Sequence, residues 1–189
     1  ADKPTDKDRK KTPTPDKADG KSPPRLSTPL MAAGFGPNAL AFLQTHLKPL
    51  KLTPVAVGDL PSDIAFGALE PGSAVGVQLV RGDVSLGALG TVTYVDGDKI
   101  LAFGHPFLKR GPAGFLMTNA YIFTTIRGLE SSFKVGATGE VIGTINQDRG
   151  AGVAGEMNRF PGFVPMRMNI RSADSGDGLL EKMDHELID

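Results

Sequence analysis

One stretch of alternating apolar and polar residues determines the fold class of this chain: Gly90-Thr91-Val92-Thr93-Tyr94-Val95-Asp96-Gly97-Asp98-Lys99-Ile100-Leu101. β-Branched and aromatic residues stand on both sides of an Asp-Gly dipeptide, which is typical of two strands joined by a tight turn. Asp-Gly supplies the positive φ angles that a type I′ turn requires. The stretch therefore predicts a β-hairpin with its turn at Asp96-Gly97.

Similar apolar runs, separated by turn residues, continue on both sides of this hairpin. The expected strands cover residues 74–80, 84–95, 99–103, 115–126, 140–145, 163–170 and 182–188. The 24 glycines and 15 prolines favour short strands and many turns over long helices. We expect a mainly β domain, a small barrel or a sandwich.

One short helix is expected before the strands, over residues 39–47. Leu40, Leu43 and Leu47 recur at helical spacing, and Pro37 and Pro49 bracket the segment. The apolar stripe of this helix is expected to pack on the β domain.

The ends of the chain differ from its middle. Residues 1–25 contain five prolines and no Val, Ile, Leu or aromatic residue, so they cannot bury enough surface to fold and should form a disordered linker. Residues 26–189 then form one β domain. Because residues 182–188 alternate as a strand at the very end of the chain, we expect a domain that is truncated at its C-terminus.

Composition argues against several classes of partner. The net charge is zero and no basic face stands out, so nucleic acid is a poor candidate. The chain has no cysteine, which excludes disulfides and thiolate zinc sites. No apolar run approaches the ~18 to 20 residues of a membrane-spanning helix, so no integral span is expected.

Cofactor and metal sites are not indicated either. His46, His105 and His185 are far apart in the sequence and lack paired carboxylates, so no metal is expected. The glycine-rich residues 150–155 lack the Gly-Lys-Ser/Thr element of a phosphate loop.

His105 is the strongest candidate for a catalytic group. It follows the apolar run Ile100-Leu101-Ala102-Phe103, with Gly104 before it and Pro106 after it. These neighbours end the strand and turn the imidazole outward, where a general base would be placed. The alternative is a structural role, in which the imidazole donates to a carbonyl and fixes the corner.

Several blocks in this order resemble the SpoIVB-type serine peptidases of bacterial sporulation, over roughly residues 70–160. The blocks are Gly90 to Tyr94, Ala102-Phe103-Gly104-His105, Ser132-Phe133-Lys134, Ile142-Gly143-Thr144-Ile145-Asn146 and Gly152-Val153-Ala154-Gly155. The resemblance implies a trypsin-like β-barrel, here part of a double barrel, with His105 as general base. The family's nucleophilic serine lies in a Ser-Gly-Ser-Pro type loop, which this chain does not contain.

The resemblance thus implies one part of a bacterial serine endopeptidase that acts on a protein or peptide substrate outside the cytoplasm, secreted or tethered to a membrane. The nucleophilic serine would lie outside this chain, so the isolated chain should be inactive. The alternative is a barrel without catalytic activity that serves as a scaffold for a protein or cell-wall partner.

The remaining candidates have simpler interpretations. Ser175 is expected in a polar turn, and Ser131 and Ser132 are expected to bond to backbone. Asp148 and Arg149 would orient His105 if the fold brought them near it; a surface turn or a local ion pair is the alternative. Arg81-Gly82-Asp83 matches an adhesion tripeptide but is expected to be a hairpin turn.

Overall fold

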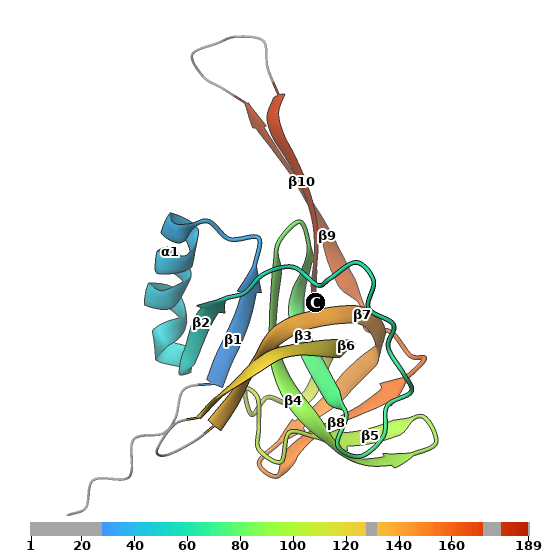
Figure 1. Cartoon of the computed structure of the whole chain (residues 1–189). Coiled ribbons are helices and arrows are strands. Elements are labelled where there is room, and N and C mark those ends of the chain that lie inside the picture. Colours follow the sequence, from blue (N-terminus) through green and yellow to red (C-terminus); the bar gives the residue numbers. More distant parts are fainter. Residues whose placement is uncertain (1–27, 128–131, 172–178, 189) are drawn as a thin grey trace, which may run out of the picture.

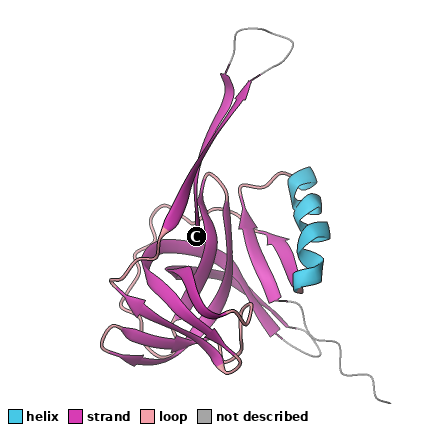
Figure 2. Cartoon of the chain, turned by 180° about the vertical axis from the view of Figure 1, so that it is seen from behind, coloured by secondary structure: helices cyan, strands magenta, loops and turns pink. Residues whose placement is uncertain are grey.

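The computed structural model describes residues 28–127, 132–171 and 179–188, and it confirms a mainly β fold with one short helix. Figure 2 shows how strongly strands dominate the chain. The elements are β1 Thr28–Ala33, α1 Pro37–Leu47, the 3-10 turn η1 Lys48–Leu50, β2 Leu52–Ala56, β3 Ala74–Gly82, β4 Ser85–Asp96, β5 Lys99–Ala102, β6 Gly111–Arg127, β7 Ser132–Arg149, β8 Gly152–Met157, β9 Phe163–Arg171 and β10 Leu179–Ile188. The expected linker over residues 1–25 lies outside the described residues.

Six of the strands form a closed ring. Their order is β4-β5-β8-β7-β6-β3, and the pairing of β3 with β4 closes it. Both β3 and β4 are longer than the ring requires, so each also pairs with a strand outside it. Ser85 to Gly87 of β4 pair with β1, and Val80 to Gly82 of β3 pair with β10.

The apolar core lies against this ring. The side chains of Val75, Val92, Ile100, Met117 and Ile145 are almost completely buried. They come from five different ring strands, and alternation along each strand directs such residues to one face. Burial of each side chain contributes about 1.5–3 kcal/mol to the free energy of folding. Because these side chains come from different strands, the ring and its core form together.

The sequence-predicted hairpin is present, but its turn lies one residue later than expected. Asp96 pairs with Lys99, which places Gly97 and Asp98 at the tip. Of these two, Gly97 alone has a positive φ, at 56°. A single positive φ at the first tip residue fits a type II′ turn, whereas type I′ needs two.

The expected helix is present as α1, which begins at Pro37 and ends at Leu47 as the bracketing prolines indicate. Leu40, Leu43 and Leu47 pack against the core cluster, as predicted. The helix connects β1 to β2, which pair in parallel and so need a crossover between them. Figure 1 shows α1 lying beside β2 at one side of the ring. Within the described residues, no helix is long and apolar enough to cross a membrane.

A long hairpin of β9 and β10 projects away from the ring, at the top of Figure 1. The hairpin joins the ring through the three residue pairs between β10 and β3. An ion pair between Arg81 of β3 and Glu186 of β10 reinforces this junction. A second ion pair, Arg167 with Asp184, joins the two strands of the hairpin at 2.5 Å.

The Arg167–Asp184 pair gives the hairpin a dependence on pH. The Arg167 guanidinium donates a hydrogen bond to the Asp184 carboxylate and holds the pKa of that carboxyl below its usual value. Because the pKa is lower in the folded than in the unfolded chain, the contribution to stability is complete above about pH 4–5 and is lost as the pH falls through the folded value. An NMR titration should give Asp184 a pKa below ~3.9 and show it rising in Arg167→Gln.

Arg159→Gln is the matched control, because Arg159 pairs with Glu156 instead. An Asp184 pKa that stays the same in Arg167→Gln would contradict the assignment.

Candidate functional site

His105 lies in the connection between β5 and β6, just after an unusual backbone turn. Phe103 and Gly104 both have positive φ, at 74° and 72°. For a bulky residue such as phenylalanine this conformation costs of order 1–3 kcal/mol, and it persists only where the surroundings enforce it. The turn ends β5 and leaves the His105 side chain exposed.

The surroundings that enforce the turn come from β4. The backbone N–H of Phe103 donates to the carbonyl of Thr91 at 2.9 Å. The Phe103 ring lies directly over Gly90, where an added Cβ would stand 2.1 Å from the ring. Because residue 90 is a glycine, it leaves the space into which the Phe103 ring packs. This packing offsets the free-energy cost of the Phe103 backbone conformation.

The hydrogen bond of His105 defines the tautomer of its imidazole. Nδ1 lies 2.9 Å from the carbonyl oxygen of Pro106. A carbonyl oxygen only accepts, so Nδ1 carries a hydrogen, and in the neutral imidazole Nε2 then carries the lone pair. No hydrogen bond to Nε2 is found among the described residues and the side chain is exposed, so the neutral ring has the tautomer of a general base.

Asp148 holds the rest of the loop. Its side chain is 0% exposed, and its carboxylate accepts hydrogen bonds from the backbone N–H groups of Phe107, Leu108 and Arg110 at 2.8, 2.7 and 3.2 Å. Three donors satisfy a buried carboxylate that would otherwise be very costly to desolvate. Asp148 thus fixes the segment that directly follows His105.

This geometry corrects the expectation of a surface turn at Asp148. The residue is near His105, as one interpretation required, but it acts on the backbone after the histidine and not on the imidazole. The expected local ion pair with Arg149 is absent among the described residues, because Arg149 Nε donates to Gln147 at 2.8 Å. Sequence reasoning missed the role because a buried aspartate before a glycine-rich turn looks like any other turn residue.

The other candidate groups do not join His105. Ser132 begins β7, whereas Asp148 lies near the other end of that strand. Ser131 and Ser175 lie outside the described residues. His46 is exposed on α1, where its Nδ1 is 2.8 Å from the Phe42 carbonyl. Among the described residues, no hydrogen bond joins His105 to a serine or threonine hydroxyl, and no cluster of three or more His, Asp or Glu residues is suited to a metal.

The two other motifs weighed in the sequence are structural. Arg81-Gly82-Asp83 is at the end of β3, as expected for a hairpin turn, and its charges bind β10: Arg81 pairs with Glu186, and the Asp83 carboxylate accepts from the Asp184 N–H at 2.6 Å. The glycine-rich residues 150–155 form the turn after β7 and most of β8.

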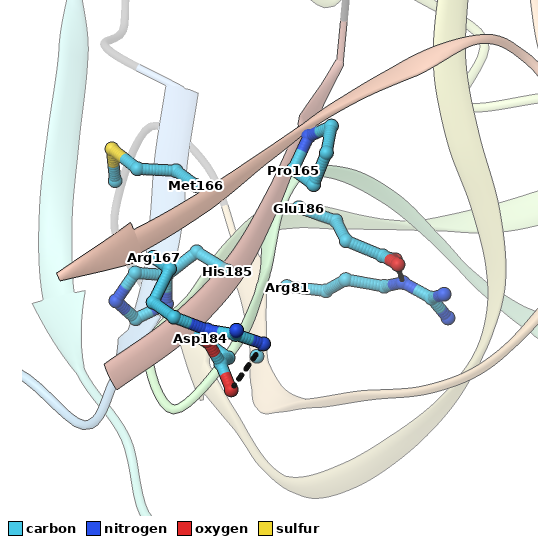
Figure 3. Close-up of a pocket in the computed structure, with 8 residues that line it drawn as sticks. Arg81, Pro165, Met166, Arg167, Asp184, His185 and Glu186 are labelled. Carbon is cyan, nitrogen blue, oxygen red and sulfur yellow. Dashed lines mark hydrogen bonds and ion pairs between the residues drawn. The ribbon is translucent and has the colours of Figure 1, made fainter. Parts of the chain in front are cut away.

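A separate hollow of about 700 Å³ lies where the long hairpin meets β3. Figure 3 shows the Arg81–Glu186 and Arg167–Asp184 pairs among its lining residues. Each cation among the described lining residues already faces a carboxylate, so these residues offer no unpaired cation to a ligand. His185 beside it is only 3% exposed, and neither ring nitrogen has a hydrogen-bond partner among the described residues. Sequence reasoning did not anticipate this buried imidazole.

No protein-family model, curated protein or solved structure matches this chain. The interpretation of the site therefore depends on the geometry of these residues.

The contact between Phe103 and Gly90 can be tested by adding a single methyl group at position 90. In Gly90→Ala the new Cβ must displace the Phe103 ring, and we expect a loss of about 1–3 kcal/mol in the free energy of unfolding, measured with urea. The His105 amide resonance should move as well. Gly114→Ala is the control, since its Cβ would approach nothing closer than 3.8 Å. Equal stability of the two variants would refute the contact.

Asp148→Asn tests the anchor of the loop. The amide keeps the shape but loses the charge, and its NH₂ cannot accept from the backbone N–H groups. We expect unfolding to become easier by about 3 kcal/mol in urea denaturation, with faster hydrogen exchange at Leu108. Asp96→Asn, at an exposed position, should change stability by less than about 0.5 kcal/mol. An Asp148→Asn protein as stable as this control would show that the carboxylate does not anchor the loop.

Proposed function

We propose that this chain is the histidine-bearing part of a bacterial serine endopeptidase, similar to the SpoIVB type, which cleaves a protein or peptide substrate outside the cytoplasm. In this proposal the ring of six strands corresponds to a trypsin-like barrel, and His105 is the general base. The nucleophilic serine lies outside the 189 residues.

One observation carries the proposal: the His105 side chain is exposed, and its Nε2 has no hydrogen-bond partner among the described residues. In the neutral imidazole, the hydrogen bond from Nδ1–H to the Pro106 carbonyl places the lone pair on Nε2. A general base in acyl transfer removes the hydroxyl proton with this nitrogen while another group holds the opposite one. Here a backbone carbonyl holds the opposite nitrogen.

The rigidity of the loop also supports the proposal. A base must stay within hydrogen-bond reach of its nucleophile, and small displacements reduce the rate strongly. The turn at Phe103 and Gly104 fixes one side of His105, and the Asp148 carboxylate fixes the other.

A second function, a scaffold that binds a protein partner, is favoured by a different surface. Val164, Met166, Met168 and Ile170 alternate along β9, so they share one face, and each is 37–51% exposed. Exposed apolar stripes of this kind commonly mark interaction sites. This surface lies on the projecting hairpin and does not involve His105.

Labelling with a fluorophosphonate probe separates the two functions. In the full-length protein that includes this chain, we expect labelling of a serine that is lost in His105→Ala and retained in His46→Ala. The 189-residue chain alone should neither be labelled nor hydrolyse peptides. If the full-length protein is not labelled although its circular dichroism spectrum is that of a folded β protein, the peptidase proposal is overturned and the scaffold is favoured.

A further inference from the structure

Two arginines lie at neighbouring backbone positions beside the His105 loop. Gly111 of β6 pairs with Asp148 of β7. Arg110 directly precedes this glycine, Arg149 directly follows this aspartate, and both arginines are exposed. The Arg110 N–H donates to the Asp148 carboxylate at 3.2 Å, which holds the end of the loop against β7. Two exposed cations therefore extend from adjoining positions of the β6–β7 pair.

Neither arginine has a counter-ion in the described part of the chain. Three other arginines each pair with a carboxylate, whereas none of the ion pairs there includes Arg110 or Arg149. The Arg149 Nε donates to the neutral side-chain oxygen of Gln147 at 2.8 Å. Like charges at adjoining positions of a sheet destabilise it, so the pair of arginines favours a carboxylate from another molecule.

The surrounding residues do not supply this carboxylate. Arg149 pairs with Gly152 of β8, which has no side chain. The nearby Asp148 carboxylate is 0% exposed and already accepts three backbone hydrogen bonds. Lys109 is also exposed, next to Arg110, and it has no ion pair with any described residue. The local charge is therefore positive and open to solvent.

The turn that carries Arg149 packs against the turn that leads into His105. A Cβ added at Gly152 would lie 3.4 Å from the backbone nitrogen of Gly104, the residue before the histidine. On the other side, Asp148 joins β7 to the segment that follows the histidine. Since an extended polypeptide advances about 3.3 Å per residue, a chain held at the two arginines reaches His105 within a few residues.

We propose that Arg110 and Arg149 bind the side-chain carboxylate of a glutamate or aspartate in the polypeptide substrate, close to the bond on which His105 acts. This inference rests on the proposed peptidase function and gives it a substrate class, acidic polypeptides. The N–H groups of a guanidinium match the two oxygens of a carboxylate. A lysine or arginine at the same place in a substrate would meet like charge.

The test is an NMR titration of the ¹⁵N-labelled chain with the peptide acetyl-Ala-Ala-Glu-Ala-Ala-amide, whose blocked ends carry no charge. We expect saturable shifts of the Gly111 and Gly150 amides, and about tenfold weaker binding of the analogue with glutamine in place of glutamate. A third peptide, acetyl-Ala-Ala-Ala-Ala-Ala with a free terminal carboxylate, should also bind more weakly. Equal or tighter binding of the third peptide would show recognition of a chain end and overturn the assignment to an acidic side chain.

Substitutions locate the binding site. Arg110→Gln and Arg149→Gln should each weaken binding of the glutamate peptide by about two- to fivefold, as expected for one exposed ion pair. Both variants keep the backbone N–H groups that bind Asp148, so the loop stays in place. Arg159→Gln is the control, because it loses the same charge two residues beyond the other end of β8, and its affinity should equal that of the wild type.

The proposal is overturned if the glutamate and glutamine peptides bind equally, or if Arg110→Gln and Arg149→Gln bind as tightly as Arg159→Gln. This failure is distinct from failure of the peptidase proposal. The titration measures binding to a chain that should not hydrolyse peptides, whereas the fluorophosphonate experiment reports an activated serine in the full-length protein. Glutamate-dependent binding without labelling would keep the arginine site and remove the reaction.

Discussion

The arrangement around His105 depends on the buried carboxylate of Asp148. A carboxylate removed from water is tolerated only when hydrogen-bond donors surround it, and the loop between β5 and β6 provides three backbone N–H groups. The dependence is mutual. Without the loop the carboxylate would be an unpaired buried charge, and without the carboxylate the loop would have three buried or half-buried donors to satisfy. The ring strand β7 and the histidine loop are therefore stabilised as one unit.

The other side of the loop is fixed by side-chain packing and not by a charged group. Phe103 adopts a backbone conformation with positive φ, which costs glycine little and a bulky residue of order 1–3 kcal/mol. Its ring packs into the space that Gly90 leaves because it has no side chain. Strain in the backbone is thus balanced by packing on the neighbouring strand. Since backbone strain that the surroundings over-determine gathers at functional sites, this balance agrees with a role for His105 beyond closing a corner.

The sequence predicted those features that local chemistry determines. Proline brackets and leucine spacing located α1, and the alternation around Gly97 located the hairpin of β4 and β5. The strands β1, β2 and β8 were not predicted, because they are five or six residues long and their Thr, Pro, Ala and Gly residues are also common in loops. These strands form only because β4, β1 and the ring offer them edges to pair with.

The same contrast between local and long-range determinants applies to the candidate site. His105 could be selected from its immediate neighbours, since the glycine and proline beside it end the strand. The partner of its loop could not, because Asp148 is forty residues from Leu108, whose amide donates to it. Nothing in the local sequence distinguishes such an aspartate from one in a turn. Contacts of this kind arise only when the ring closes.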